Sequence, residues 1–506
     1  MIKKTMNILL AFLIILACFG CHNKEDVSMV DDNYRNVYEI FVGSFRDSDG
    51  DKKGDLNGVT GELDYIQDMG YTAIWLMPIH PSVSYHKYDV ADYYGIDSSY
   101  GTMEDFENLL KEAHKRNIDV YMDLVVNHTS NQHPWFLQGA QAYYNGTDSP
   151  YIEYYNFIDE YRYGYSEYRG IYYEARFTYS MPELNLDSPK VREEIAAIMK
   201  FWLDKGVDGF RLDATTSFYT GEPDKNVEFL SWINETAKSI KEDCYIVGEC
   251  WENNTTVKKY YTSGIDSFFY FDYSQGEGLI VKAMKAAEPA TQYRSILTNA
   301  LTIANGHIPA IFLDNHDVNR ITNAIGSANM DQLKFVYGLS AMFNGSVYTY
   351  YGTEIGMIGS KNDPNRRIAM LWDSDKKDEL CDNPEGTTAA KYVFKGVEQQ
   401  KKDENSILNY SKQVNYLRNK FPQIARGEIT VDSEHSDSSL LIIEKKWNDE
   451  SIGIVINFDR SNSVTVDCSH LEYKKCEYAA VYSTDEARFK NGTLELPAYG
   501  IAILYR

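Results

Sequence analysis

Eight short apolar, β-branched runs alternate with helical patterns along most of the chain, from about residue 37 to residue 421. They cover Val37–Phe45, Thr72–Pro78, Asp119–Asn127, Gly209–Asp213, Tyr245–Cys250, Ser267–Asp272, Ala310–Asn315 and Val347–Tyr351. Amphipathic segments such as Met103–Arg116 and Pro189–Lys205 lie between them. Eight strands that alternate with helices predict an α/β fold, a (β/α)8 TIM barrel. A doubly wound open sheet is the alternative, although such a sheet more often has fewer strands.

One connection in this alternation is too long for a plain loop. Residues 129–188, rich in Tyr, Asn and Gly, separate the third strand from the helix before the fourth. A structureless loop of that length is uncommon inside a compact domain. We therefore predict an inserted subdomain at 129–188, which divides the catalytic barrel into 36–128 and 189–423.

The last part of the chain, residues 424–506, has a different pattern. Apolar and polar residues alternate with a period of two in Leu440–Lys445, Ile452–Asn457, Ser463–Val466 and Ile501–Tyr505. Alternation of this kind is typical of strands with one buried face. The pattern predicts a C-terminal antiparallel β-sandwich domain.

The N-terminus has the pattern of a targeting segment. Lys3 and Lys4 precede an apolar run at residues 8–18, which is shorter than a membrane-spanning helix needs. The run ends in a stretch that resembles a bacterial lipoprotein signal, with Gly20 before the cleavage point and Cys21 as the lipidated residue. This predicts a signal peptide at 1–20, a tether at 21–35 and an extracytoplasmic protein anchored to a bacterial membrane, at the cell surface or in the periplasm. An ordinary signal peptide with a chance cysteine is the alternative.

Composition narrows the class of ligand. The net charge of −24 argues against nucleic acid as a partner, because phosphate binding needs clustered Lys and Arg. Aromatic residues make up 14% of the chain, with 41 tyrosines, an excess suited to stacking on sugar rings or to core packing.

The cysteines do not define a disulfide framework. Of the seven cysteines, five lie beyond Cys21, which is an odd number. Cys468 and Cys476 could form a disulfide bond, but the sequence does not decide whether they do.

Three carboxylates follow predicted strands at the end where barrel enzymes place their chemistry. Asp213, Glu249 and Asp317 each come at or just after the end of an apolar run. Arg211 lies two residues before Asp213, and His316 directly precedes Asp317. The third predicted strand adds further polar side chains, namely Asp123, Asn127 and His128.

Glycoside hydrolysis needs two carboxyl groups with different protonation states. A carboxylate beside a guanidinium keeps a low pKa, which favours Asp213, next to Arg211, as the nucleophile. Glu249 follows an apolar strand with no cation adjacent in the sequence, so we expect a raised pKa and a role as general acid.

Several motifs, in the same order along the chain, resemble those of the α-amylase family, glycoside hydrolase family 13. The principal ones are Asp123-Leu-Val-Val-Asn-His128, Gly209-Phe-Arg-Leu-Asp-Ala214, Val247-Gly-Glu249 and Phe312-Leu-Asp-Asn-His-Asp317. Supporting matches are Met181-Pro-Glu-Leu-Asn185, Trp75-Leu-Met-Pro78 and Gly352-Thr-Glu-Ile-Gly356. Among members of the family, the chain is most similar to bacterial α-amylases of the intermediate group that carries the Met-Pro-Asp-Leu-Asn type of motif.

The resemblance implies a retaining mechanism on α-glucosidic bonds, with Asp213 as nucleophile, Glu249 as acid/base and Asp317 as transition-state stabiliser. It also implies that the sugar beside the scissile bond is held by Arg211, His128 and His316, with Tyr88 stacked against its ring. Trp135 and Trp251 are weaker candidates for flanking sugar subsites, with core packing as the alternative for each.

An acidic loop after the first strand predicts a calcium site. Asp47, Asp49, Asp51 and Asp55, with the carbonyl of Lys53, place oxygen ligands at alternate positions of a tight turn. The loop is not an EF-hand, but it resembles the calcium loop of several family members, and a solvated acidic turn is the alternative. A second family calcium site at Asn127 is doubtful, because Ala-Thr-Thr-Ser follows Asp213 where many amylases have Lys and His.

The exact reaction within the family depends on fewer residues. Exo-acting glucosidases of the family carry an acid three residues before the stacking tyrosine, paired with a distant Arg, whereas this chain has Tyr85 there. Arg366 and Arg367 occur later, and we expect them to lack that acid partner. This favours an endo-acting α-amylase on starch, maltodextrin or related α-glucans. The alternatives are a cyclomaltodextrinase or neopullulanase-like enzyme, an exo-α-glucosidase and, more distantly, a catalytically silent starch-binding lipoprotein.

Overall fold

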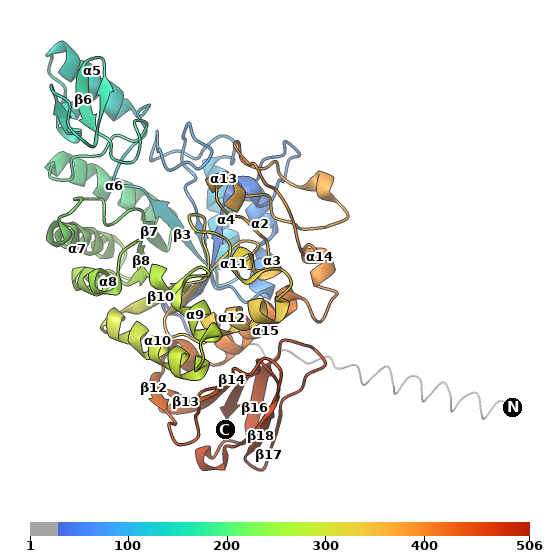
Figure 1. The fold of residues 1–506 in the computed structure, drawn as a ribbon. Coiled ribbons are helices and arrows are strands. Elements are labelled where there is room, and N and C mark those ends of the chain that lie inside the picture. The colour runs from blue at the N-terminus through green and yellow to red at the C-terminus, as the bar shows by residue number, and fades with distance from the viewer. Residues whose placement is uncertain (1–28) are drawn as a thin grey trace. The chain divides into compact units, whose positions relative to one another are not determined.

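Eight parallel strands close into a barrel in the computed structural model, which describes residues 29–506 (Figure 1). The strands are β1 (Asn36–Ile40), β2 (Ala73–Leu76), β3 (Asp119–Leu124), β7 (Gly209–Leu212), β8 (Tyr245–Gly248), β9 (Ser267–Phe269), β10 (Ile308–Phe312) and β11 (Ser346–Tyr350). The predicted TIM barrel and its eight strands are confirmed. Each strand ends one to five residues earlier than predicted.

Helices surround the barrel on its outer side (Figure 1). The longer ones are α4 (Met103–His114), α6 (Pro189–Lys205), α7 (Pro223–Ile240), α10 (Pro289–Ala304), α12 (Met330–Ala341) and α15 (Ile407–Lys420). Shorter ones are α2 (Leu56–Gly61), α3 (Leu63–Asp68), α8 (Asn254–Tyr260), α9 (Leu279–Lys285), α11 (Ile321–Ile325), α13 (Asp363–Arg366), α14 (Val397–Gln400) and α16 (Gln423–Arg426). Local sequence sets their ends: Thr102 and Asp105 form a capping box that starts α4, and Gly206 ends α6 in a left-handed conformation.

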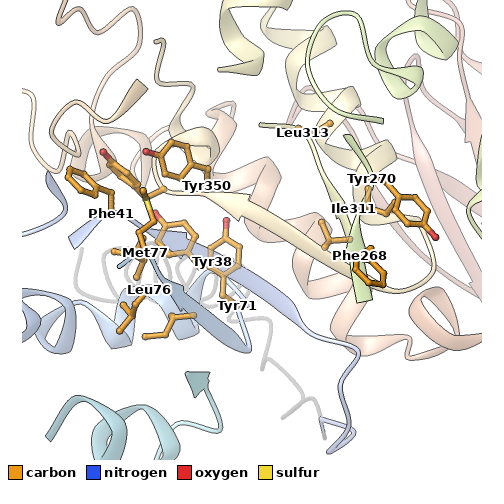
Figure 2. Packing of buried hydrophobic residues seen from close by; sticks show 14 of the residues in the cluster. Tyr38, Phe41, Tyr71, Leu76, Met77, Phe268, Tyr270, Ile311, Leu313 and Tyr350 are labelled. Carbon is orange, nitrogen blue, oxygen red and sulfur yellow. The ribbon is translucent and has the colours of Figure 1, made fainter. Parts of the chain in front are cut away.

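Both faces of the barrel strands are buried, so side chains alternate between two apolar clusters. Val37, Trp75 and Tyr121 fill the barrel interior, whereas Tyr38, Ile74 and Val120 pack outward against the helices. Alternation with a period of two places the next interior positions at the carboxyl ends of the strands. Figure 2 shows part of the outward layer, including the stack of Tyr38 and Tyr71 beside Leu76 and Met77 and a second group with Phe268, Tyr270, Ile311 and Leu313.

The insertion predicted at 129–188 has its own secondary structure. It contains α5 (Pro134–Asn145) and a three-stranded sheet in the order β4-β6-β5, at the upper left of Figure 1. The strands are β4 (Phe157–Ile158), β5 (Tyr165–Tyr168) and β6 (Ile171–Glu174), with a short 3-10 helix, η2 (Pro150–Tyr154), before them. The insertion returns to the barrel through an isolated bridge between His128 and Glu183, which brings the Met181–Asn185 motif against the end of β3.

Two antiparallel sheets form the C-terminal part, as predicted. One has five strands, β12 (Glu428–Val431), β13 (Leu440–Trp447), β14 (Glu450–Asn457), β19 (Ile501–Tyr505) and β16 (Lys475–Ala479). The other has three, β15 (Val464–Asp467), β18 (Thr493–Leu496) and β17 (Arg488–Lys490). Apolar residues of both sheets, such as Ile442, Val466 and Leu494, meet in one cluster. The sequence pattern did not predict β12, β16, β17 or β18, which are short and mostly half-exposed.

The parts of the chain before and after the boundary predicted at residue 424 pack against each other. Ile424, Leu441 and Ile454 belong to the same apolar cluster as Leu417 of α15, so the C-terminal sheets pack directly on the barrel helices. Residues 32–506 accordingly form one compact unit. The free cysteines of the described chain are Cys244, Cys250, Cys381, Cys468 and Cys476, so the pairing of Cys468 with Cys476 is not formed.

The predicted signal peptide and the lipidation site Cys21 lie outside the described residues. The predicted tether is too long at its carboxyl end: Arg35 is buried and pairs with Asp119 at 2.8 Å, and Asp32 pairs with Arg426. These ion pairs fix residues 32–35 to the barrel. Within residues 29–506, no helix is both long enough and apolar enough to cross a membrane.

Candidate active site

The carboxyl ends of β1, β3, β7 and β8 bring charged side chains into the barrel mouth. Glu39, Asp123 and Arg211 occupy interior positions that continue the alternation set by Val37, Tyr121 and Gly209. Strand register places Asp123 directly beside Arg211. Asp213 and Glu249 follow one residue after β7 and β8, so the sheet geometry itself brings the two acids together.

Arg211 is the centre of the site. Its side chain is 1% exposed, and its Nη1 donates to Asp123 Oδ1 and to Asp213 Oδ1, both at 2.8 Å. Its Nη2 donates to Glu249 Oε2 at 2.7 Å. The surrounding carboxylates raise the pKa of Arg211 well above its ordinary value, against the effect of burial. One permanently charged guanidinium therefore holds three carboxylates in fixed positions.

The expected low pKa of Asp213 is wrong. Burial raises it to about 6, and the neighbouring Asp123 and Asp317 add to that rise, so that the opposing effect of Arg211 is only partial. The sequence showed one adjacent cation but not the neighbouring carboxylates, which share that cation. Asp213 is thus mostly ionised at pH 7 but titrates close to neutrality.

Glu249 has a raised pKa, as expected, but the reason differs from the expectation. A cation does contact it, since Arg211 comes from the adjacent strand, and the backbone N–H of Ala214 donates to the same Oε2 at 2.9 Å. Burial nevertheless raises the pKa of Glu249 to about 7, helped by the charge of Asp213. Ala214 has a φ of 49°, a strained conformation for a residue with a side chain, and it holds this donor in place.

Asp317 differs from the other two acids. Its side chain is 30% exposed, and it pairs with His316 Nε2 at 3.0 Å and with Arg367 Nη2 at 3.2 Å. Burial acts to raise the pKa of Asp317, but His316 and Arg367 together hold it well below its ordinary value. On the other side of the ring, His316 Nδ1 contacts Glu39 at 2.5 Å, and Asp317 and Glu39 raise the pKa of His316 to about 10 against burial.

Tyr88 and His128 lie beside this network. The Tyr88 hydroxyl donates to Asp123 at 3.0 Å and lies 2.7 Å from His316 Nε2, and its ring is parallel to that of His316. His128 Nε2 contacts the Tyr88 carbonyl oxygen at 3.2 Å, and burial lowers the pKa of His128 to about 4, so this ring is neutral at pH 7. The structure therefore brings together the three acids, Arg211, His316, Tyr88 and His128 at one end of the barrel.

Arg367 lacks the acid that exo-acting relatives carry at the position of Tyr85, as expected, but it pairs with a different acid. Its Nη1 pairs with Asp363 Oδ2 at 2.7 Å, and the hydroxyl of Tyr85 lies 2.5 Å from the same carboxylate oxygen. Asp363 is four residues earlier and lies in α13, so the pair forms on one short helix instead of across the cleft. Tyr85 also accepts from Arg367 Nη1 at 3.2 Å.

The two candidate tryptophans have different environments. Trp135 in α5 is 9% exposed and packs against Tyr93, His133 and Tyr154, so it is a packing residue of the insertion and not a sugar platform. Trp251, two residues after Glu249, is 51% exposed and stacks on Phe271 at 4.5 Å between centroids. Of these two tryptophans, only Trp251 offers an aromatic face to solvent.

The acidic loop gathers three of its predicted ligands. Carboxylate oxygens of Asp47, Asp49 and Asp55 lie within 4.8 Å of one another, which fits a hard cation with oxygen ligands. Asp51 is not part of this group, and its Oδ1 accepts from the backbone N–H of Lys53 at 2.7 Å. No such group includes a residue near Asn127 in the described chain; its side-chain amide lies 3.4 Å from His128 Nδ1.

Sequence reasoning missed Glu39, Asp363 and Phe177. Glu39 was inside a predicted strand, and its interior position, two residues after Val37, was the signal that could have found it. Phe177 belongs to the insertion, is 51% exposed and lies 5.4 Å from the ring of His128. No pattern in the sequence shows that this residue of the insertion lies next to the barrel mouth.

Comparison with known proteins agrees with this geometry. The model of the family described as alpha amylase, catalytic domain, matches residues 39–427. Alpha-amylase 3 of Dictyoglomus thermophilum is 41% identical over 84% of this chain and 85% of that relative. The solved structure of Eubacterium rectale Amy13B has a TM-score of 0.90 and 40% identity, covering 96% of this chain and 97% of that one. An oligo-1,6-glucosidase of Parageobacillus thermoglucosidasius is 28% identical over 89% of this chain and 94% of that relative. The chain is therefore a glycoside hydrolase that belongs to the alpha-amylase family.

Proposed function

We propose that this protein is a retaining, endo-acting α-amylase that hydrolyses α-1,4-glucosidic bonds of starch, maltodextrins or related α-glucans. The observation that carries the proposal is the contact of one guanidinium, that of Arg211, with both Asp213 and Glu249. Because a single planar group spans both carboxylates, they lie close together, as in retaining glycosidases, where the two carboxyl groups are about 5 to 5.5 Å apart.

The two acids have the protonation states that a double displacement needs. With a pKa of about 6, Asp213 is mostly ionised at pH 7 and attacks the anomeric carbon to form a glycosyl ester. Glu249, with a pKa of about 7, keeps a large protonated fraction and gives its proton to the leaving oxygen. Once the leaving group departs, the Glu249 carboxylate takes a proton from water, which then cleaves the ester.

Asp317 supports the transition state in this proposal. It stays ionised at neutral pH and is the most exposed of the three acids, so its oxygens are available to sugar hydroxyls. His316 is positively charged and hydrogen-bonded on both ring nitrogens, which fixes its orientation beside the sugar. Arg211, His128 and the ring of Tyr88 complete the subsite of the sugar that is attacked.

Endo action is supported by the residues around this subsite. Tyr85 is a neutral phenol, with a pKa that burial raises well above its ordinary value, and it does not add the acid that exo-acting relatives use to close the pocket. The exposed face of Trp251 lies just past the general acid, where a further glucose unit of a polymer would stack. Phe177 offers a second exposed ring from the insertion.

Exo-α-glucosidase or cyclomaltodextrinase and neopullulanase-like action is the second candidate. The contact of Arg367 with Tyr85 favours it, because an arginine does lie beside the position at which exo-acting relatives carry the acid. The likeness to an oligo-1,6-glucosidase points in the same direction. A silent starch-binding protein is the third candidate, and the intact set of three acids argues against it.

Product analysis over time tests these alternatives. Amylose, pullulan and cyclodextrin are each incubated with the enzyme, and iodine staining, reducing ends and oligosaccharide sizes are followed. Endo action predicts that iodine staining falls before reducing ends accumulate, with maltodextrins of mixed length. Glucose as the sole early product would establish exo action, and faster cleavage of cyclodextrin or pullulan than of amylose would favour the second candidate. If none of the three substrates gave a product, the third candidate, a catalytically silent starch-binding protein, would be favoured.

We also propose that the acidic loop binds Ca²⁺, with Asp47, Asp49 and Asp55 as carboxylate ligands. The ion would supply positive charge that balances the three acids and would hold the loop closed. Dialysis against a chelator should lower the melting temperature of the parent protein, and calcium should restore it. An Asp49→Asn variant should lose that response, while a chelator effect of equal size in the variant would place the calcium elsewhere.

We propose further that Cys21 carries lipid and holds the enzyme outside the cytoplasm at a bacterial membrane. The support is the sequence pattern of a basic start, a short apolar run and Gly20-Cys21. Labelling of expressing bacteria with a fatty-acid precursor should mark the protein but not a Cys21→Ser variant. Equal labelling of both, or of neither, would rule out lipidation at this position.

A further inference from the structure

Two histidines and one aspartate meet on the C-terminal domain, far along the chain from the catalytic acids. Asp432 follows β12 of the five-stranded sheet, and His435 lies in the turn after it. His470 lies in η7 (Ser469–Leu471), the short 3-10 helix that follows β15 of the three-stranded sheet. The cluster therefore joins segments that leave the two different sheets of the sandwich.

The two imidazoles converge on the carboxylate of Asp432. His435 Nδ1 lies 2.9 Å and His470 Nε2 lies 2.6 Å from Asp432 Oδ2. The two imidazole rings are nearly parallel, with an angle of 14° and centroids 3.9 Å apart. All three ligand atoms lie within 4.8 Å of one another. Both ring nitrogens thus face the same small volume beside the carboxylate.

Backbone hydrogen bonds hold the two turns that carry the cluster. Asp432 N–H donates to the Ile442 carbonyl at 3.0 Å, and Asp432 Oδ1 accepts from the N–H groups of Glu434 and His435 at 3.2 Å. His435 Nδ1 also lies 3.0 Å from Oδ1, so its imidazole spans both carboxylate oxygens, whereas the bond of His470 is to Oδ2. Leu471 N–H donates to the Cys468 carbonyl at 3.1 Å and closes the turn that carries His470.

The donor set differs from that of the acidic loop. Two imidazole nitrogens and one carboxylate oxygen are ligands that Zn²⁺ prefers, whereas an all-oxygen group suits Ca²⁺. The side chains of His435 and His470 are 35% and 34% exposed, so an ion can reach them from solvent and keep a water molecule as its fourth ligand. Asp432 is less exposed, at 14%, and anchors the group.

We propose that Asp432, His435 and His470 bind one Zn²⁺ ion, which ties the turn after β12 to η7. The ion replaces the direct contacts of the two imidazoles with the Asp432 carboxylate by three metal–ligand bonds that link the two sheets. A hydrogen-bonded trio without affinity for metal is the alternative.

Zinc binding to the full-length chain tests the proposal. Metal-free protein is titrated with ZnCl₂ by calorimetry, with calcium in excess to occupy the acidic loop. The parent should bind one zinc ion with an affinity that Asp432→Asn, His435→Ala and His470→Ala each weaken by more than about tenfold, since losing only a group that supports a metal ligand already costs about that much. His114→Gln is the matched control, because His114 pairs with Asp208 at 2.7 Å but has no second histidine beside it in the described chain.

The control should bind zinc as the parent does. Equal binding by the parent and the three site variants would overturn the proposal, because the ion would then lie elsewhere, and so would a parent that binds no zinc.

A second measurement needs no variant. Histidine modification by diethyl pyrocarbonate, mapped by peptide mass spectrometry, should be slowed by zinc at His435 and His470 and unchanged at His114. Equal modification of all three histidines with and without zinc would contradict the proposal even if a site variant failed to fold.

Discussion

Two regions of this protein bury cations, and they do so in different ways. At the barrel mouth, Arg211 is surrounded by Asp123, Asp213 and Glu249. Where the barrel meets the C-terminal domain, Arg418 and Lys445 are equally buried, but their partners are mainly backbone carbonyls. The first region holds an excess of negative charge, whereas in the second region no carboxylate of residues 29–506 is a hydrogen-bond partner of Arg418 or Lys445.

Most carbonyls at the second region come from the end of α12 and the turn that follows it, and one, that of Ile424, comes from α16. Arg418 donates to the carbonyls of Ala341 and Phe343 at 2.6 Å each, and Lys445 donates to those of Met342 at 2.9 Å and Ile424 at 2.7 Å. The last carbonyls of a helix lack partners within it and carry partial negative charge. Burial lowers the pKa of Arg418 to about 9 and that of Lys445 well below its ordinary value.

The comparison separates charges that stabilise from charges that react. At the junction, a cation satisfies carbonyl groups that would otherwise be buried without partners, so its loss should cost stability. At the barrel mouth, the acids repel one another and burial raises the pKa of two of them, so their presence serves the chemistry. Substitutions in the two regions should therefore affect different measurements.

The largest effect is expected for Asp213→Asn. Loss of the nucleophile should lower kcat on amylose by more than about 10³-fold while the melting transition stays cooperative. Asp208→Asn is the matched control, since Asp208 directly precedes the other end of β7 and pairs with His114 and Lys241. That variant should lose stability and keep kcat. A nucleophile variant with more than about a thousandth of the parent activity would remove Asp213 from this role.

The pH profile gives the next effect. Activity requires Asp213 ionised, hence pH above about 6, and Glu249 protonated, hence pH below about 7, so kcat/KM should follow a narrow bell between these values. Glu249→Gln should lower kcat by about 10² to 10⁴-fold and remove the basic limb. Glu252→Gln, at an exposed acid three residues later, should leave the bell unchanged. A basic limb that persists in Glu249→Gln would assign the acid to another residue.

At the junction, Lys445→Met should act on stability alone. It leaves the carbonyls of Met342 and Ile424 without their donor, a cost of about 1 to 3 kcal/mol in the free energy of unfolding, and should not change kcat. Burial lowers the pKa of Lys445 in the folded protein, so the folded protein loses the Lys445 proton at a lower pH than the unfolded chain, which keeps it up to about pH 10. The stability of the parent relative to the variant should rise as pH increases toward that value, in denaturant titrations at several pH values. If the free energy of unfolding of the parent, relative to that of the variant, fell as pH increased, burial would not be what lowers the pKa of Lys445.

The smallest effect is expected for Trp251→Ala. Loss of a stacking face for one glucose unit should raise KM for long glucans by about two- to tenfold, with little change on short substrates. Trp251→Phe keeps an aromatic face and should behave like the parent. An equal change in KM for long and short substrates would mean that Trp251 does not form a flanking subsite.

The repeating parts of the fold followed directly from the sequence. Strands buried on both faces give apolar runs that a pattern can detect, and acids that end those runs identified Asp213, Glu249 and Asp317. The strands β12 and β17 were not predicted because they are only four and three residues long and none of their residues is buried.

The ion pairs of the site and the pKa values of its acids could not be predicted from the sequence. The contact of Arg211 with Glu249 joins neighbouring strands that are far apart in the sequence, and the pair of Glu39 with His316 joins residues 277 positions apart. The pKa of Asp213 depends on how many carboxylates share one guanidinium, which only the closed barrel determines. The choice between a sugar subsite and packing for Trp135 stayed open for a related reason, because its burial against Tyr93 and Tyr154 depends on how the insertion folds.

The central claim is a double displacement through Asp213, and trapping the covalent intermediate tests it most directly. The enzyme is incubated with a 5-fluoro-α-glucosyl fluoride, digested, and its peptides are mapped by mass spectrometry. We predict a single glycosylated peptide with the sugar on Asp213, and no adduct in Asp213→Asn. A sugar found on Glu249 or Asp317, or turnover with inversion and no adduct at all, would contradict the account.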